Sequence, residues 1–166
     1  MNILITGACG FIGFSLAEEL MKTKNIIIGV DNINNYYSKK LKKKRLSILK
    51  KKKNFQFILA DINNYKKIIK ETKNIKIDII FNFAAQAGVR YAVKNPKSYV
   101  HSNVEGFKSL IKFVLHKKPK KFIFASSSSV YGDAKKYPVK EGDNLNPKNL
   151  YAKTKKFNEE YSKRIL

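Results

Sequence analysis

Cysteine, histidine and long apolar runs are scarce in this chain of 166 residues, and each scarcity excludes a class of protein. The single cysteine, Cys9, rules out an intrachain disulfide and fits a reducing cytosol. The two histidines, His101 and His116, have no Cys, Asp or His companions at ligand spacing, so we expect no metal site. The apolar runs have the length of strands, far below a membrane span, and the N-terminus enters a strand at once, without a signal peptide. We therefore expect a soluble cytoplasmic protein without a membrane partner.

Acidic residues and arginines are also few. Asp and Glu number 12 against 35 Lys and Arg, which gives a formal charge of +23, and only three of the basic residues are arginines. A nucleic-acid or acidic-membrane partner would explain such a charge, but proteins that read bases and phosphates tend to use the bidentate guanidinium. The 19 Ile and 16 Asn that accompany the 32 Lys favour a coding bias instead. We accordingly expect no nucleic-acid partner, although the charge would help to attract polyanionic nucleotides.

The densest charge lies in Lys39–Lys53, where ten of fifteen residues are Lys or Arg. Leu41, Ile48 and Leu49 interrupt this segment at spacings that fit one buried stripe of a helix. The pattern favours a helix with a solvated face over a nucleic-acid patch.

Short β-rich runs alternate with longer helical patterns along a chain that is 43% hydrophobic and of one-domain length. The predicted strands are continuous apolar runs at Asn2–Thr6, Ile26–Asp31, Phe55–Ala60, Asp78–Phe83 and Lys121–Ser126. Such runs are typical of strands that are buried on both faces of a parallel sheet. The repeated βα units predict an α/β fold with a doubly wound parallel sheet of the Rossmann type.

Two Asn-Pro pairs predict helix starts, because asparagine caps a helix and proline suits its first turn. After Asn95-Pro96, one apolar stripe predicts a long helix, with Val100, Val104, Phe107, Ile111 and Val114 as its members. Asn146-Pro147 repeats the signal and places Tyr151 about one turn into the last helix.

The first strand runs into a glycine-rich turn, Thr6-Gly7-Ala8-Cys9-Gly10-Phe11-Ile12-Gly13, that opens an amphipathic helix. In such a turn the backbone N–H groups can approach a pyrophosphate at the helix N-terminus. Near the end of the chain, Tyr151 and Lys155 share one helical face, where the ammonium favours loss of the phenolic proton. Together the two features predict nicotinamide chemistry on a hydroxyl group.

Two aspartates end predicted strands and bear on the choice of cofactor. Asp31 ends the second strand, eighteen residues after Gly13. A carboxylate there can accept both ribose hydroxyls of an adenosine and repel a 2′-phosphate, which predicts NAD rather than NADP. Asp61 ends the third strand, where it can accept from the adenine amine or cap the next helix, and the two roles can coexist.

These motifs resemble the extended short-chain dehydrogenase/reductase superfamily, which combines Thr-Gly-x-x-Gly-x-x-Gly with Tyr-x-x-x-Lys. Three further strings narrow the resemblance to the UDP-glucuronate 4-epimerases, relatives of UDP-glucose 4-epimerase: GVDNINNYY at 29–37, AAQAGVRY at 84–91 and SSSSVYG at 126–132. The resemblance covers essentially all 166 residues. It implies an NAD-dependent isomerase that converts a UDP-sugar substrate, UDP-glucuronate to UDP-galacturonate, through a 4-keto intermediate. It also implies a homodimer in the full-length form.

The resemblance assigns a role to each cofactor-binding residue. These are Gly7, Gly10, Phe11, Ile12 and Gly13 at the pyrophosphate, Asp31 and Asn32 at the adenosine ribose, Asp61 and Ile62 at the adenine, Ala84, Ala85 and Gln86 along the cofactor, and Asn103 beneath the nicotinamide. Gly13 would also allow close packing of the helix on the strand. Lys155 would bind the nicotinamide ribose, beside Tyr151.

Catalysis is assigned to Ser127, Tyr151 and Lys155. The tyrosinate form of Tyr151 would remove the proton of the sugar's 4-hydroxyl while C4 delivers hydride to NAD⁺, and Ser127 would hydrogen-bond the same oxygen. Ser128 and Ser129 stand where related dehydratases and decarboxylases carry carboxylates, and they would hydrogen-bond the sugar carboxylate without added negative charge. Arg90 would meet this carboxylate or a phosphate, or would form a structural salt bridge.

The family's chains are considerably longer, so a further strand and the small domain that grips UDP and sugar would be absent. On this interpretation residues 1–166 are an incomplete NAD-binding Rossmann domain, truncated before the substrate domain and inactive alone. Three alternatives remain open: a non-catalytic NAD-binding fragment, a UDP-glucose 4-epimerase, or a related nucleotide-sugar dehydratase or decarboxylase.

Overall fold

The computed structural model describes residues 1–134 and 136–166. These residues form two compact units. Unit 1 consists of Met1–Ala84 and Lys108–Phe124, and unit 2 of Ala85–Phe107 and Ala125–Leu166.

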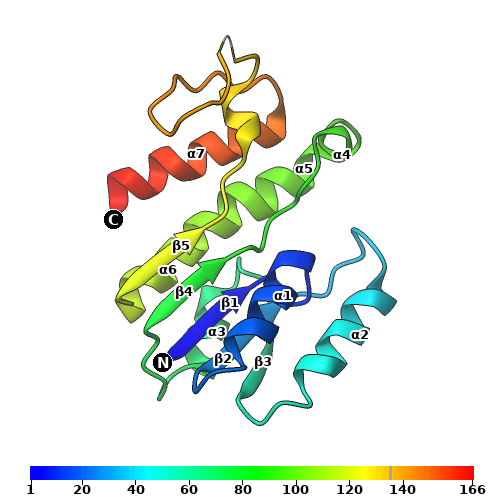
Figure 1. The fold of residues 1–166 in the computed structure, drawn as a ribbon, viewed down its shortest axis with the longest axis vertical. Coiled ribbons are helices and arrows are strands. Elements are labelled where there is room, and N and C mark those ends of the chain that lie inside the picture. The colour runs from blue at the N-terminus through cyan, green and yellow to red at the C-terminus, as the bar shows by residue number, and fades with distance from the viewer. Residues whose placement is uncertain (135) are drawn as a thin grey trace. The chain divides into compact units, whose positions relative to one another are not determined.

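Unit 1 is built on a five-stranded sheet in the order β3-β2-β1-β4-β5 (Figure 1). The strands are β1 (Asn2–Thr6), β2 (Ile26–Asp31), β3 (Phe55–Leu59), β4 (Ile79–Asn82) and β5 (Lys121–Phe124). All neighbouring strands are parallel, which confirms the predicted sheet. β3, β4 and β5 are one or two residues shorter than the sequence predicts. The strand order reverses between β1 and β4, the position at which open α/β sheets bind ligands.

Helices cover both faces of this sheet, because alternate residues of each strand point to opposite sides. Ile3 and Ile5 of β1 belong to a core that includes residues of α1 (Phe11–Leu20) and α2 (Lys39–Leu49). Leu4 belongs to a second core that includes residues of α3 (Tyr65–Glu71) and α6 (Gly106–Lys117). Figure 1 shows α1 and α2 on the near face of the sheet and α3 on the far face. The sheet is therefore doubly wound, as predicted.

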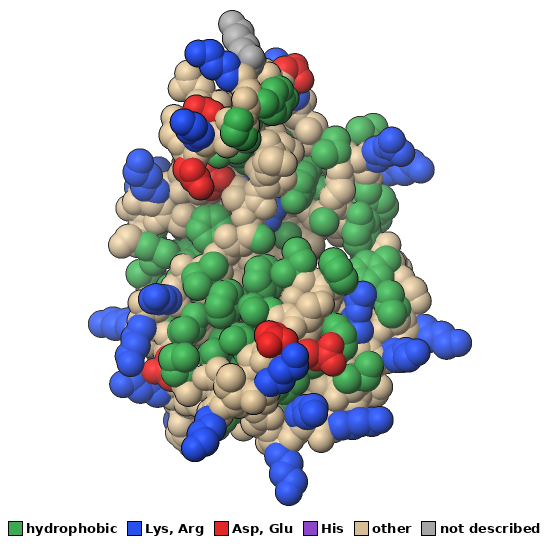
Figure 2. All heavy atoms as spheres, viewed as in Figure 1, with side chains coloured by type: hydrophobic (Ala, Val, Ile, Leu, Met, Phe, Trp, Pro, Cys, Tyr) green, Lys and Arg blue, Asp and Glu red, His purple; other side chains and the backbone are tan. Residues whose placement is uncertain are grey.

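The lysine-rich helix α2 buries Leu49 as predicted, but the other members of its buried stripe differ from those predicted. Lys42, Leu46 and Leu49 are its buried residues, whereas Leu41 is 41% exposed. Lys42 can occupy the buried stripe because its ammonium donates to the backbone oxygen of Asn34. The remaining lysines of the segment are solvated, and Figure 2 shows Lys and Arg side chains spread over the visible face rather than gathered on one element.

Unit 2 begins with a helical stretch that differs from the single helix expected. It contains α4 (Val89–Lys94), α5 (Pro96–Tyr99) and a π-helical segment η1 (Val100–Glu105) that leads into α6. The predicted cap is confirmed, because the Asn95 side chain accepts from the Ser98 N–H and Pro96 opens α5. The wider π turn shifts the buried face by one residue, so that Tyr99 and Asn103 are buried while Val100 is 45% exposed.

The second half of unit 2 holds a 3-10 turn, η2 (Ser128–Tyr131), and the helix α7 (Leu150–Ile165). The predicted start of α7 at Asn146-Pro147 is wrong. Asn149 is the cap, since its side chain accepts from the Ala152 N–H at 2.9 Å, and Tyr151 is the second helical residue. A second asparagine three residues downstream thus replaces the first as the cap. In the part of the chain described, no helix is long and apolar enough to cross a membrane.

Candidate active site

The glycine turn between β1 and α1 presents its backbone to a ligand. Gly7 has a φ of +70°, and a Cβ on it would lie 2.8 Å from the backbone nitrogen of Ala84, so only glycine suits the position. A Cβ on Gly13 would lie 2.3 Å from the Gly7 oxygen, which shows how closely the first turn of α1 approaches the glycine turn. Gly10 supplies no capping side chain, and no acidic residue stands in the first turn. The first N–H groups of α1 are therefore available to an anion.

Asp31 ties the end of β2 to this turn. Its Oδ2 accepts from the Cys9 N–H at 3.0 Å and its Oδ1 from the Ile33 N–H at 2.8 Å. These bonds fix the carboxylate, while each oxygen keeps a further lone pair for a ribose hydroxyl. Cys9 is fully buried, and burial, reinforced by the charge of Asp31, raises the pKa of its thiol to about 12. This thiol is a packing group rather than a nucleophile.

The ends of β2 and β3 are joined by Asn32 and Asp61. The Asn32 side chain donates to Asp61 Oδ2 at 2.7 Å, and Asp61 Oδ1 accepts from the backbone and side-chain N–H groups of Asn63 at 2.9 Å. A capping role for Asp61 is wrong, because Asn64 caps α3 by accepting from the Lys67 N–H. Ile62, which follows Asp61, is 6% exposed.

Cationic and aromatic side chains of the segment after β2 contact the glycine turn. Arg45 Nη1 donates to the Cys9 oxygen at 3.4 Å and to the Tyr37 hydroxyl at 3.1 Å, and that hydroxyl donates to the Cys9 oxygen at 3.3 Å. Lys42 donates to Asn34 Oδ1 at 2.7 Å, and burial lowers the pKa of its ammonium. The sequence analysis missed these contacts, because nothing in a run of lysines marks the one that turns inward.

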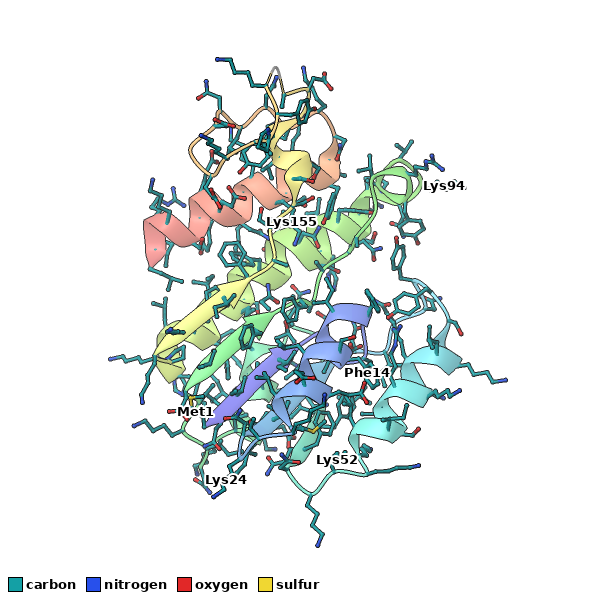
Figure 3. The ribbon with its side chains drawn as sticks, in the orientation of Figure 1. Met1, Phe14, Lys24, Lys52, Lys94 and Lys155 are labelled. Atoms are coloured by element: carbon teal, nitrogen blue, oxygen red, sulfur yellow. The ribbon has the colours of Figure 1, made fainter. Side chains whose placement is uncertain are left out.

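Unit 2 carries the Tyr-x-x-x-Lys pair. Lys155, labelled on α7 in Figure 3, is 5% exposed and donates through Nζ to the Ala125 oxygen at 2.8 Å. Its Nζ lies 5.9 Å from the centroid of the Tyr151 ring. None of the carboxylates in residues 1–134 and 136–166 forms an ion pair with Lys155. Burial accordingly lowers the pKa of Lys155 to about 8. A readily deprotonated ammonium therefore lies beside a half-buried phenol.

Ser127, which caps η2, and Ser129 form a pair of hydrogen-bonded hydroxyls. Ser127 Oγ accepts from the backbone N–H of Ser129 at 3.2 Å and from its hydroxyl at 2.8 Å. Ser127 and Ser129 are half-buried, whereas Ser128 is exposed. Because Ser127 only accepts in these bonds, its own proton can be donated to a ligand oxygen.

Gln86 is held by Asn103 through its backbone. The Gln86 N–H donates to Asn103 Oδ1 at 2.7 Å, and Asn103 Nδ2 donates to the Gln86 oxygen at 3.0 Å. Of the buried side-chain nitrogen and oxygen atoms that the structure describes, Gln86 Nε2 alone lacks a hydrogen-bond partner. A buried donor without a partner is the kind of group that a bound ligand satisfies. Ala84, which ends unit 1, and Ala85, which begins unit 2, are half-buried.

Arg90 and the histidines are not part of these groups. Arg90 is exposed on α4. Within the described ranges it forms no salt bridge, so the structural salt bridge that the sequence left open is not observed. The described residues also contain no group of three or more His, Cys, Asp or Glu that could hold a metal ion.

The observed groups fit a dinucleotide. Unit 1 offers the free N–H groups at the start of α1 to a pyrophosphate and the fixed Asp31 carboxylate to a ribose. Unit 2 offers the Lys155 ammonium and the unpartnered amide nitrogen of Gln86.

The sequence analysis overlooked two further polar residues of unit 2. Thr154 and Asn158 are 3% and 2% exposed, and Asn103 Nδ2 donates to Thr154 Oγ1 at 3.0 Å. They follow Tyr151 by three and seven residues, a spacing that places them on one face of α7. That periodicity of polar residues was the available signal.

Comparison with known proteins gives consistent matches. The family model described as GDP-mannose 4,6 dehydratase matches residues 4–165. UDP-glucuronate 4-epimerase 1 of Arabidopsis thaliana is 41% identical over 162 residues, which cover 96% of this chain and 38% of that protein. A solved UDP-glucuronic acid 4-epimerase from Bacillus cereus, in complex with UDP-glucuronic acid and NAD, has a TM-score of 0.89 at 34% identity over 99% of this chain and 52% of that one. The solved UDP-Glc/GlcNAc 4-epimerase of Campylobacter jejuni has a TM-score of 0.87 at 30% identity. The match covers 99% of this chain and 48% of that one.

The chain spans about half the length of the curated relatives it matches. Over that half, the family match runs from β1 to α7 and so includes the glycine turn of unit 1 and the tyrosine–lysine pair of unit 2. On this evidence the chain belongs to the GDP-mannose 4,6 dehydratase family.

Proposed function

We propose that this chain is the cofactor-binding half of an NAD-dependent UDP-sugar 4-epimerase. The observation that carries the proposal is the buried Lys155, which lies beside Tyr151 without a carboxylate partner among the described residues. A buried ammonium with a lowered pKa, next to a phenol, is an arrangement that serves proton transfer. Solved 4-epimerases of the same fold support the proposal, one of them in complex with NAD and UDP-glucuronic acid.

The cofactor would be held by residues of both units. In unit 1 the glycine turn and the first N–H groups of α1 would bind the pyrophosphate, Asp31 and Asn32 the adenosine ribose, and Asp61 and Ile62 the adenine. In unit 2 Lys155 would bind the nicotinamide ribose, and Gln86 would donate its free amide proton. Asn103 already uses its amide on Gln86 and Thr154, so we assign it the positioning of Gln86 rather than direct contact with the nicotinamide.

Bound NAD⁺ supplies the acceptor for the hydrogen that leaves the sugar's C4. Tyr151 would take the proton of the 4-hydroxyl through its phenolic oxygen, with the Lys155 ammonium 5.9 Å from the centre of its ring. Ser127 donates its free proton to the same sugar oxygen and so stabilises the developing charge. After the 4-keto sugar turns over, the hydrogen and its electron pair would return to the other face of C4 and Tyr151 would return the proton to the oxygen, so that the configuration at C4 is inverted without net oxidation.

The finer proposal is that the sugar is glucuronate. Ser128 and Ser129 supply hydroxyls where an acid or base would promote elimination or decarboxylation, and hydroxyls can bind a carboxylate without repelling it. UDP-glucose is the alternative sugar, and a dehydratase or decarboxylase the alternative reaction. Arg90, exposed on α4, would meet the sugar carboxylate or a phosphate.

Further contacts to UDP and sugar, beyond those of Arg90 and the serines, would come from the part of the enzyme that this chain does not span, because the relatives are about twice its length. Catalysis needs the reacting atoms to be held within about 3–3.5 Å of each other. We therefore propose that residues 1–166 alone do not epimerise UDP-sugars. The homodimeric state and cytoplasmic location of the full-length form stay predictions.

We predict that this chain binds NAD⁺ more tightly than NADP⁺ by at least about tenfold, because the fixed Asp31 carboxylate repels the 2′-phosphate. Titration calorimetry with each dinucleotide measures both dissociation constants. Asp31→Asn keeps the shape of the side chain but removes the charge. It should therefore reduce the ratio of the NADP⁺ dissociation constant to the NAD⁺ dissociation constant. Equal affinities in the parent chain, or tighter NADP⁺ binding, would contradict the role of Asp31.

In a full-length form, we predict conversion of UDP-glucuronate to UDP-galacturonate and its loss in Tyr151→Phe. The substitution keeps the ring and removes the titrating hydroxyl, so turnover should fall by about 10²-fold or more while NAD⁺ binding persists. Chromatographic separation of UDP-sugars measures turnover, and calorimetry measures cofactor binding. Substantial turnover by Tyr151→Phe would show that another group moves the proton. A pentose or a dehydrated sugar as the main product would favour the alternative reactions.

The buried charge of Lys155 leads to a prediction about stability. Its pKa falls from 10.5 to about 8 on folding, so the charged form opposes folding by about 3 kcal/mol at neutral pH. This penalty is complete below the folded pKa and disappears as pH rises toward the unfolded value. Lys155→Met also loses the bond to Ala125, which offsets about 1 kcal/mol.

We therefore expect Lys155→Met to unfold with a free energy about 2 kcal/mol higher than the parent chain at pH 7, and to lose that advantage at pH 10. Urea unfolding of both chains at the two pH values measures the difference. Two results would contradict the conclusion that Lys155 carries a buried charge that opposes folding. One is a variant less stable than the parent at pH 7, and the other is a difference in unfolding free energy that does not change with pH.

A further inference from the structure

Four buried polar side chains of unit 2 form one connected group, which we call the Asn103 cluster. Its members are Gln86, Asn103, Thr154 and Asn158, and their exposed fractions are 4%, 1%, 3% and 2%. They come from three separate parts of the chain: the segment before α4, the π-helical segment η1 and the helix α7. A polar group this deeply buried must have its hydrogen bonds satisfied, or it destabilises the fold.

Asn103 is the centre of the cluster. Its Oδ1 accepts from the Gln86 N–H, and its Nδ2 donates one proton to the Gln86 oxygen. The side chain thus pairs with the Gln86 backbone as a neighbouring β-strand would. Its second Nδ2 proton is donated to Thr154 Oγ1 at 3.0 Å. Both amide protons are then used, so the plane of the Asn103 carboxamide is fixed from two directions. Without Thr154, only Gln86 would hold that amide in place.

Thr154 connects Asn103 to the helix that carries the tyrosine. Its hydroxyl accepts from Asn103 and donates to the backbone oxygen of Tyr151 at 2.7 Å. Asn158, one turn further along α7, places its amide beside the backbone oxygens of Asn103 and Thr154. With the amide oriented so that its nitrogen faces them, it donates to the Asn103 oxygen at 2.7 Å and to the Thr154 oxygen at 3.1 Å. The backbone of Asn103 is thereby held as well as its side chain.

The residues that follow Gln86 are fixed from the same helical stretch. The buried Tyr99 donates through its hydroxyl to the Ala87 and Gly88 oxygens, and its ring packs edge-on against Tyr151 with centroids 6.2 Å apart. Tyr99 and Asn103 lie on either side of the start of η1, and π-helical segments occur frequently at functional sites. Tyr99 and Asn103 therefore hold the segment 86–88 in position, and both also contact α7, the helix of Tyr151 and Lys155.

We infer that Thr154 is a positioning residue. Through Asn103 it fixes the backbone of Gln86 relative to the helix that carries Tyr151 and Lys155. The unpartnered Nε2 of Gln86 is then presented to a ligand from a fixed backbone. The inference rests on the proposed function for what the positioning serves, but not for the hydrogen-bond path itself.

The path is tested on this chain by amide hydrogen exchange followed by NMR. Thr154→Val keeps the shape of the side chain and removes the hydroxyl, and Thr154→Ala removes it without any risk of overpacking. In both variants we expect the Gln86 amide to exchange at least about tenfold faster than in the parent, because the Asn103 amide loses one of its two anchors. Thr154→Ser, which keeps the hydroxyl, is the matched control and should retain the protection. The amides of β1 and β2 report on global stability.

Equal Gln86 exchange in Thr154→Val, Thr154→Ala and Thr154→Ser would overturn the inference. It would also be overturned if the Gln86 amide accelerated only in step with the amides of β1 and β2, since the hydroxyl would then merely stabilise the fold. If Thr154→Val does not fold, the comparison of Thr154→Ala with Thr154→Ser decides.

The functional consequence is tested in a full-length form. We expect Thr154→Val to lower kcat by about tenfold and to raise the Kd for NAD⁺, at unchanged KM for the UDP-sugar, with rescue by Thr154→Ser. An unchanged kcat would contradict a positioning role even where the exchange result holds. Absence of epimerase activity in the parent enzyme would instead overturn the proposed function, and the exchange experiment would still decide whether Thr154 positions Gln86.

Discussion

The parallel pairing of β1 with β2 and with β4 is the constraint on which the ligand-facing features of unit 1 depend. Thr6 lies in register with Val30 on one side and with Asn82 on the other, so the strands end together at one edge of the sheet. The chain can then turn directly beside β2, where the Gly7 N–H donates to the Val30 oxygen at 2.8 Å and Asp31 accepts from the turn. A slip of one residue would move these side chains to the opposite face. The open glycine backbone and the fixed carboxylate thus follow from strand register.

Unit 2 meets a different constraint, the burial of a positive charge. Lys155 gains one hydrogen bond, to a neutral carbonyl, and burial lowers its pKa to about 8. Packing alone does not require an ammonium at this position, because an apolar side chain of similar length would fill the same space without the desolvation penalty. The proposed proton transfer would account for a charge retained next to Tyr151. Stability and chemistry are therefore opposed at this residue, as is common in active sites.

Much of the fold follows from local signals in the sequence. The continuous apolar strands, the Asn95-Pro96 helix start and the glycine turn each have one favourable structural solution, and the structure adopts it. The predictions of local structure that were wrong also have physical causes. A π-helical segment shifted the buried face after Pro96, and Asn149 competed successfully with Asn146 for the helix cap. Lys42 was unpredictable because its burial depends on a backbone oxygen that only the folded loop provides.

The residues of the candidate site also fall into those that the sequence predicts and those that it does not. Residues in motifs, such as Asp31 and Lys155, could be named from spacing, because the motif itself encodes a local geometry. The spacing of Thr154 and Asn158 places them on one face of α7 but does not give their roles, because these depend on a contact with Asn103, some fifty residues away in sequence. Long-range polar contacts of this kind leave little trace in one sequence. They are nevertheless what places the motif residues.

The central claim is that this chain carries the cofactor-binding half of a nucleotide-sugar epimerase, and the most direct test is to locate bound NAD⁺ on it. Titration of the isotope-labelled chain with NAD⁺, followed by amide chemical shifts, maps the contact residue by residue. We predict shifts concentrated in the glycine turn, at Asp31 and Asn32 and in the segment 85–88, with the exposed lysines of α2 unchanged. Shifts confined to those lysines, or no shifts at millimolar NAD⁺, would contradict it.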